Sequence, residues 1–206
     1  MYSKCKICRS AKDKLFLRGE RCFSPKCAMI RKPYAPGKSN KKKGGRKLSD
    51  YGEHLLEKQK VRNHYGLSEK QFKRYFKSVG RGGLIGNLLL QKLETRFDNV
   101  IFRLGFTESR REARQLTSHG HFTINGIKVD IPSYNLKAGD TISIRKKSLE
   151  NIPLFQDLKN KLKNYETPTW LSLDKVKLVG KVISKPNIQE LRSPFNMQLV
   201  VEYYSR

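Results

Sequence analysis

The sequence predicts an α+β fold, with helices in the first half of the chain and short antiparallel strands in the second. Apolar residues recur at helical spacing between Ser49 and Leu104. They alternate on both sides of Asn125-Gly126, the strongest short hairpin signal. All four cysteines lie between Cys5 and Cys27, in a segment too poor in apolar residues to build a core. The length of 206 residues suits two small domains.

Positive charge is the second property that constrains the protein. The chain has 44 Lys and Arg against 18 Asp and Glu, a formal net charge of +26, and residues 1–50 alone hold 16 cations and 3 anions. This excess predicts a polyanionic partner. No apolar run approaches the roughly 18 residues of a membrane span, and the start of the chain lacks the apolar region of a secretory signal. We therefore expect a soluble intracellular protein with no membrane partner.

A basic linker and two helices are predicted next. The segment Tyr34–Lys47, YAPGKSNKKKGGRK, combines Pro and Gly with six cations, which indicates an extended linker. Ser49 is a suitable N-cap for a helix that should end at Gly66. Ser68 and the glutamine three residues later form a capping box. The apolar face of the helix that follows repeats at i, i+3, i+4 and i+7 over Phe72, Tyr75, Phe76 and Val79.

The middle of the chain predicts helices and then strands. An amphipathic helix is expected from Leu90 to Leu104, ended by Gly105. Ser109 and Glu112 form a further capping box, for a short basic helix that should end at Gly120. After the Asn125-Gly126 hairpin, the pattern predicts a strand at Thr141–Arg145, a helix at Pro153–Lys163, and strands at Trp170–Leu173, Val176–Ile183 and Leu199–Tyr204.

The cysteines follow the pattern C-x2-C, thirteen residues, C-x4-C. Two close pairs allow two short loops to present four thiolates to one tetrahedral ion, as in structural zinc sites. Metal binding would also supply the ordering free energy that a segment without a core lacks. An iron-sulfur cluster and free or redox-active thiols are the alternatives. We expect zinc and no catalysis there, because four sulfur ligands leave no open coordination position. The predicted ligands are Cys5, Cys8, Cys22 and Cys27.

The basic helix and the corner after it are the main candidate RNA contacts. Arg110, Arg111 and Arg114 lie within five residues of a capped helix, and guanidinium groups bind two phosphate oxygens at once. His119 and His121 flank a glycine at the helix-to-hairpin corner, where they can contact ribose or base. The alternatives are a solvated arginine face and histidines that only satisfy the corner. We expect recognition of RNA shape and backbone, because helical RNA hides its base edges in a narrow groove.

The stretches RREARQLTSHGHFTINGIKVDIPSY and KAGDTISI resemble the small RNA-binding module of the family of small-subunit ribosomal protein four. GERCFSPKCAMIRKPYAPG, LSDYGEHLLEKQKVRNHYGLSEKQF, PTWLSLD and VVEYYSR resemble the same family in its cysteine-bearing bacterial form. The resemblance implies an α+β fold in three parts. These are a metal-stapled N-terminal segment and basic linker at 1–47, a discontinuous, mainly helical domain with a small C-terminal β part at 48–92 plus 153–206, and an inserted αα-β hairpin RNA-binding module at 93–152.

The resemblance also implies a function. It implies a structural component of the small ribosomal subunit that binds small-subunit rRNA early in assembly, contacts neighbouring ribosomal proteins, and lies near the channel through which mRNA enters. An influence on decoding accuracy and repression of its own message are implied as well. We expect it on cytoplasmic ribosomes, with organellar ribosomes as the alternative. The further predicted RNA-binding residues are Lys41, Lys42, Lys43, Arg46, Lys47, Lys58, Lys60, Arg62, Lys73 and Arg74.

Two other function classes explain the sequence less well. RNA-modifying synthases carry a similar module, and Thr95-Arg96-Phe97-Asp98 contains the Arg-x-Asp of their active site, with Asp98 as nucleophile. However, Asp98 falls within a helix at core spacing, and no separate catalytic domain is left once the module is removed. A zinc-dependent DNA-binding regulator would require a recognition helix directly after the cysteines, and none is present at the usual spacing. We therefore predict a protein that is not an enzyme.

Overall fold

The computed structural model describes residues 4–37, 48–80, 84–187, 191 and 194–205, and the chain forms two compact units. Unit 1 comprises Met1–Leu89 and Ser193–Arg206, and unit 2 comprises Leu90–Arg192. The first unit is thus built from two separate segments of the chain. The boundary differs from the expected one, because residues 153–192 fold with unit 2 and only the last fourteen residues return to unit 1.

Unit 1 is helical in its described residues, and two of its helices begin at the predicted caps. Ser49 Oγ accepts a hydrogen bond from the backbone N–H of Gly52 at 3.3 Å, and Ser68 Oγ accepts one from Gln71 at 3.3 Å. Both predicted N-caps are confirmed. The elements of unit 1 are α1 (Lys4–Ala11), the 3-10 helix η1 (Gly19–Cys22), α2 (Ala28–Arg31), α3 (Asp50–His64), α4 (Glu69–Ser78) and α11 (Met197–Ser205).

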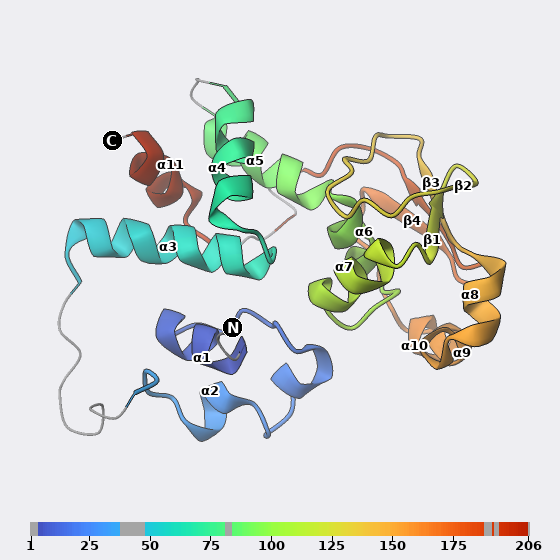
Figure 1. Cartoon of the computed structure of the whole chain (residues 1–206), viewed down its shortest axis with the longest axis horizontal. Helices are drawn as coiled ribbons and strands as arrows, with labels where there is room; N and C mark the ends of the chain where they lie inside the picture. Colours follow the sequence, from blue (N-terminus) through green and yellow to red (C-terminus); the bar gives the residue numbers. More distant parts are fainter. Residues whose placement is uncertain (1–3, 38–47, 81–83, 188–190, 192–193, 206) are drawn as a thin grey trace. The chain divides into compact units, whose positions relative to one another are not determined.

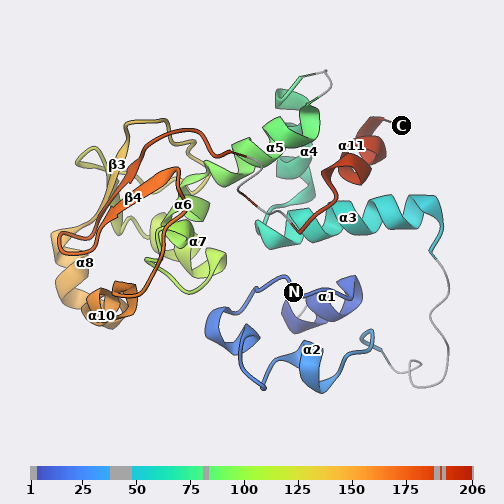
Figure 2. The ribbon, with the colours of Figure 1, turned by 180° about the vertical axis from the view of Figure 1, so that it is seen from behind.

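The C-terminal element is a helix, so the strand predicted at Leu199–Tyr204 is wrong. Asn196 starts α11, because its Oδ1 accepts hydrogen bonds from the N–H groups of Gln198 (3.1 Å) and Leu199 (3.4 Å). Val200 is fully buried. Both views of the ribbon show α11 lying beside α3 (Figure 1 and Figure 2). Burial of one helical face therefore outweighs the β propensity of the Val and Tyr residues.

Unit 2 combines helices with one antiparallel sheet. The sheet has the strand order β2-β1-β3-β5-β4, so the two strands that follow residues 93–152 in sequence extend the sheet formed within those residues. This pairing explains why residues 153–192 belong to unit 2. The strands are β1 (Phe122–Ile124), β2 (Ile127–Lys128), β3 (Thr141–Ile144), β4 (Leu171–Asp174) and β5 (Val179–Val182). The helices are α6 (Phe97–Arg103), α7 (Arg110–Ser118), α8 (Lys146–Asn151), α9 (Pro153–Gln156) and α10 (Leu158–Leu162), and α5 (Ile85–Glu94) spans the boundary between the units.

The helix predicted from Leu90 to Leu104 is interrupted, which corrects the prediction. Arg96 adopts an extended conformation, with φ −65° and ψ 140°, and separates α5 from α6. Its side chain is fully buried and donates to Asp98 through Nε (3.1 Å) and Nη2 (2.9 Å). The N–H groups of Phe97 and Asp98 donate to the carbonyls of Tyr134 (2.8 Å) and Pro132 (3.2 Å). Tertiary partners thus replace the helical hydrogen bonds that the break removes.

The Asn125-Gly126 hairpin is confirmed, with φ of 50° and 82° at its two turn residues. The third strand is confirmed at Thr141–Ile144. The single helix predicted at Pro153–Lys163 is replaced by the short helices α9 and α10. The next two predicted strands are present in shorter or shifted form as β4 and β5, with Asp174 accepting the N–H groups of the turn between them.

The core of unit 2 lies between the sheet and its helices. Phe97 and Ile101 of α6 and its C-cap residue Leu104 pack against Phe122 and Ile142 of the sheet, and all five are fully buried. In both ribbon views α6 and α7 lie side by side (Figure 1). This packing holds the basic helix α7 by its apolar side. Of the helices that the structure describes, none is long and apolar enough to cross a bilayer.

Candidate metal centre and nucleic-acid interface

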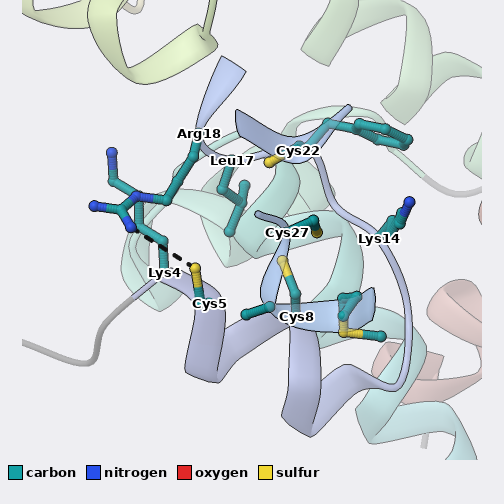
Figure 3. Close-up of a pocket in the computed structure, with 11 residues that line it drawn as sticks. Lys4, Cys5, Cys8, Lys14, Leu17, Arg18, Cys22 and Cys27 are labelled. Atoms are coloured by element: carbon teal, nitrogen blue, oxygen red, sulfur yellow. Dashed lines mark hydrogen bonds between the residues drawn. The ribbon is translucent and has the colours of Figure 1, made fainter. Parts of the chain in front are cut away.

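The four cysteines come together around one pocket. Cys5 and Cys8 lie on α1, Cys22 ends η1, and Cys27 is the N-cap of α2. All four line the same pocket, shown in Figure 3, and Cys8, Cys22 and Cys27 are buried. Arg18 Nη1 lies 3.9 Å from the sulfur of Cys5, drawn as a dashed line. Three short helical elements, separated by loops, thus bring the four predicted ligands to one pocket.

The pKa of Cys8 reflects both its burial and its proximity to the other three thiols. Burial raises the pKa of Cys8 most strongly, a backbone hydrogen bond with Leu15 lowers it, and the charges of Cys22, Cys5 and Cys27 raise it. Four thiols facing one pocket, with a guanidinium beside one of them, are the donor set that a structural tetrathiolate centre requires. Within the described ranges, however, no group of three or more His, Cys, Asp or Glu side chains stands ready to hold an ion. Zinc binding therefore stays a prediction.

The basic helix α7 begins at its predicted cap. Ser109 Oγ accepts from the N–H of Glu112 at 3.3 Å, and Glu112 Oε2 accepts from the N–H of Glu108 at 3.0 Å. Arg111 is exposed and Arg114 is half-buried. Arg110 differs from the prediction of an outward side chain: its Nε donates to Asn99 Oδ1 at 2.7 Å, and its guanidinium lies 4.4 Å from the ring centroid of Phe102.

A buried polar network fixes Arg110. Asn99 donates through Nδ2 to the carboxylate of Glu94 at 2.7 Å. Arg103 donates to the same carboxylate through Nε (3.0 Å) and Nη2 (2.9 Å). Glu94 is only 1% exposed, so α5, α6 and α7 are joined through one desolvated carboxylate. Arg110 therefore positions α7 as well as adding charge to its surface.

The corner between α7 and β1 carries the two predicted histidines. His119 is exposed, and His121 Nδ1 lies 3.1 Å from Ser148 Oγ. Burial, followed by the charges of His119 and Arg145, lowers the pKa of His121, which favours the neutral ring at neutral pH. Arg145 Nη1 donates to the carbonyl of Gly120 at 3.1 Å. Sequence reasoning missed Arg145, because its position at the end of a predicted strand gave no sign that it reaches this corner.

Three cations predicted to bind RNA form ion pairs within unit 1. Lys58 is 3% exposed, and its Nζ lies 2.8 Å from Glu69 Oε1 and 4.7 Å from the centroid of the Tyr203 ring. This burial argues against Lys58 as an RNA contact. Lys60 Nζ pairs with Glu57 (2.6 Å) and Asp13 (3.5 Å), and Arg62 Nη1 lies 3.5 Å from Glu69 Oε2. Lys58 and Arg62 thus join α3 to α4, and Lys60 joins α3 to the residues that follow α1.

The remaining predicted contacts fall into two groups. Lys73 and Arg74 of α4 are exposed, as an RNA contact requires. Lys41, Lys42, Lys43, Arg46 and Lys47 lie outside the described residues.

The structure also bears on the enzyme alternative. Asp98 is 4% exposed, and both of its carboxylate oxygens accept hydrogen bonds from Arg96. Its Oδ1 also accepts from the N–H of Asn99 at 2.9 Å. A nucleophile must reach its substrate. This carboxylate instead stabilises the start of α6.

Comparisons with known proteins match nearly the whole chain. The family model described as "Ribosomal protein S4/S9 N-terminal domain" matches residues 1–94, and the one described as "S4 domain" matches residues 95–142. The small ribosomal subunit protein uS4 of Thermus thermophilus is 47% identical over 203 residues, 98% of this chain and 96% of that protein. The protein of that name from Acetivibrio thermocellus is 47% identical over 205 residues, 99% of this chain and 97% of that protein. The chain therefore belongs to the family of small ribosomal subunit protein uS4.

Proposed function

We propose that this chain serves as a structural component of the small ribosomal subunit and binds small-subunit rRNA. The near-complete match to uS4 proteins of several bacteria is the observation that carries this proposal. The family consists of structural ribosomal proteins, not enzymes, and rRNA and ribosomal proteins are the corresponding partners. The place of action is the ribosome in the cytoplasm, as for bacterial relatives.

The RNA-binding surface of unit 2 centres on α7 and the corner that follows it. Arg111 and His119 are exposed and Arg114 is half-buried, so these side chains can offer hydrogen-bond donors to RNA. Arg145 is held at the same corner, because its Nη1 donates to the carbonyl of Gly120. Guanidinium groups on a rigid helix bind phosphates of a folded RNA without ordering a loop first. The surface therefore suits recognition of RNA shape and backbone.

We infer in addition that Cys5, Cys8, Cys22 and Cys27 hold one zinc ion. The shared pocket, the burial of three thiols and the guanidinium of Arg18 support this assignment. Bound zinc would join α1, η1 and α2, and its four thiolate ligands leave no position for catalysis. Native mass spectrometry of the purified protein should show one zinc ion. Iron with labile sulfide would identify a cluster instead, and a metal-free protein with unchanged fold would reject both.

The finer roles rest on the basic linker. We propose that the lysines and arginine between Lys41 and Lys47 lie near incoming mRNA, and that the protein influences decoding accuracy and represses its own message. These roles are supported by the density of cations in that segment and by the family to which the chain belongs. Replacing the five cations by glutamine should raise miscoding in a translation assay while the protein is still incorporated into subunits.

Binding measurements test the main proposal. The protein should bind folded small-subunit rRNA more tightly than duplex DNA of equal length, with affinity that falls as salt rises. Equal affinity for the two nucleic acids at every salt concentration would indicate a nonspecific binder and reject the proposed function.

A further inference from the structure

Two aromatic side chains beside the cysteine cluster are exposed to solvent. Phe16 and Phe23 stack on each other, with ring centroids 5.0 Å apart and an interplanar angle of 27°. Phe23 is 75% exposed and Phe16 is 37% exposed. Phenylalanine normally gives up its large apolar surface to a core or an interface. The packing of unit 1 leaves most of Phe23 and part of Phe16 uncovered, so an external partner is the natural explanation.

The backbone holds this pair in place at a cost. Phe16 has φ +51°, a left-handed conformation that bulky residues rarely adopt. Such a conformation persists only where its surroundings enforce it, and it is commonly found at functional positions. Leu15, the preceding residue, is 2% exposed, and Phe16 itself lines the cysteine pocket. Phe23 directly follows the buried Cys22, and its N–H donates to the carbonyl of Glu20 at 3.0 Å. The cysteine cluster thus fixes the position of both rings.

The charge around the rings selects the chemistry of the partner. From residue 14 to residue 26 one acidic side chain, Glu20, is present, and it is exposed. An apolar protein surface laid on the rings would desolvate the nearby cations without pairing them. A nucleic acid offers both a flat base for the rings and phosphates for the charges. The cations of this stretch, all at least partly exposed, are Lys14, Arg18, Arg21 and Lys26.

We propose that the Phe16–Phe23 pair is a stacking platform for an unpaired base of small-subunit rRNA, with the surrounding cations on the flanking phosphates. The proposal rests on the proposed function, which supplies the RNA. Bases inside an RNA helix have their faces covered by neighbouring base pairs, so the platform selects an unstacked nucleotide in a loop, bulge or junction. Stacking tolerates any base, so the platform adds affinity more than sequence preference.

The test compares two substitutions of the more exposed ring. Phe23→Leu keeps an apolar side chain and removes the π face, whereas Phe23→Trp keeps it. We expect Phe23→Leu to weaken binding to folded small-subunit rRNA by about 5- to 100-fold and Phe23→Trp to bind at least as well as the unsubstituted protein. The slope of log K against log salt should stay unchanged in both, because a stacked base releases no counterions. Tyr51→Leu, which removes a ring 53% exposed on α3, is the matched control and should leave affinity unchanged.

The outcomes separate the platform from the proposed function. If the unsubstituted protein fails to bind the rRNA, the proposed function fails. If it binds, and Phe23→Leu binds equally well, the platform is rejected while the proposed function stands. Equal weakening by Phe23→Leu and Phe23→Trp would also reject stacking. A photoreactive benzophenone side chain at position 23 gives a readout that does not depend on comparing affinities. It should crosslink to an unpaired nucleotide in assembled subunits, and crosslinks confined to protein or to paired nucleotides would overturn the proposal.

Discussion

Removing the carboxylate of Asp98 should strongly destabilise unit 2. The side chains of Arg96 and Asp98 are 1% and 5% exposed, and Asp98→Ala removes the acceptor of two hydrogen bonds from Arg96 and one from the Asn99 backbone. Breaking a buried ion pair by removing one partner costs roughly 3 to 5 kcal/mol, because the other charge stays in a low-dielectric site. With a urea slope of about 2 kcal/mol/M, the unfolding midpoint should fall by roughly 1.5 to 2.5 M.

The chain provides its own reporter for this measurement. Its single tryptophan, Trp170, is 2% exposed in the core of unit 2, so urea unfolding followed by tryptophan fluorescence reports on that unit. The double variant Arg96→Met/Asp98→Leu removes both charges and should recover most of the stability. Glu202→Gln removes the partially exposed pair with His54 in unit 1 and should leave the fluorescence transition unchanged. A destabilisation below about 1 kcal/mol for Asp98→Ala would refute the account of the helix break.

Three further predictions concern unit 1 and the RNA-binding surface. Val200→Asp places a charge in the fully buried face of α11, so it should expose unit 1 to proteolysis while the tryptophan transition of unit 2 stays in place. Replacing Arg111 and Arg114 by glutamine should weaken rRNA binding and reduce the salt slope by roughly 0.7 to 0.9 for each phosphate that the protein no longer neutralises; an unchanged slope would remove α7 from the interface. Burial raises the pKa of Glu69, but hydrogen bonds from Lys58 and Tyr204 outweigh it, so the net shift is downward. A carboxyl with a depressed folded pKa loses its stabilisation as pH falls through that pKa. Urea unfolding followed by circular dichroism should therefore show that unit 1 loses stability as the pH falls below 4.5, the ordinary pKa of a glutamate. The Glu69→Gln variant should show less of this pH dependence.

Local chemistry made some elements predictable. The helix caps at Ser49, Ser68 and Ser109 are correctly predicted, because each serine side chain accepts a hydrogen bond from a backbone N–H three residues later. The Asn125-Gly126 turn is correctly predicted, because both residues tolerate the positive φ that the turn requires. The grouping of the cysteines is likewise visible in their spacing. These features depend on residues a few positions apart, so the sequence displays them directly.

Contacts between residues far apart in the sequence account for the differences between the predicted and the observed structure. Nothing local distinguishes Arg96 from other residues of an amphipathic helix; the break depends on a carboxylate two residues on and on carbonyls more than thirty residues away. The C-terminal helix has the composition of a strand, because Val and Tyr favour strands until a helical face is buried. Lys58 shares its helix with Lys60 and Arg62, and spacing alone does not say that Glu69 and Tyr203 draw it inward.

The aromatic pair on the cysteine segment shows a different limit. Core spacing explained the aromatic residues of α4 and α6, but Phe16 and Phe23 lie in loops where no periodicity applies. Their exposure and stacking become visible only once the cysteines have placed the two loops side by side.

The most direct test of the account is the structure of a small ribosomal subunit purified from cells that make this protein. We expect the chain in stoichiometric amount, with Arg111 and Arg114 within hydrogen-bonding distance of rRNA phosphates. A subunit that lacks the chain, or one in which α7 faces solvent, would contradict the account.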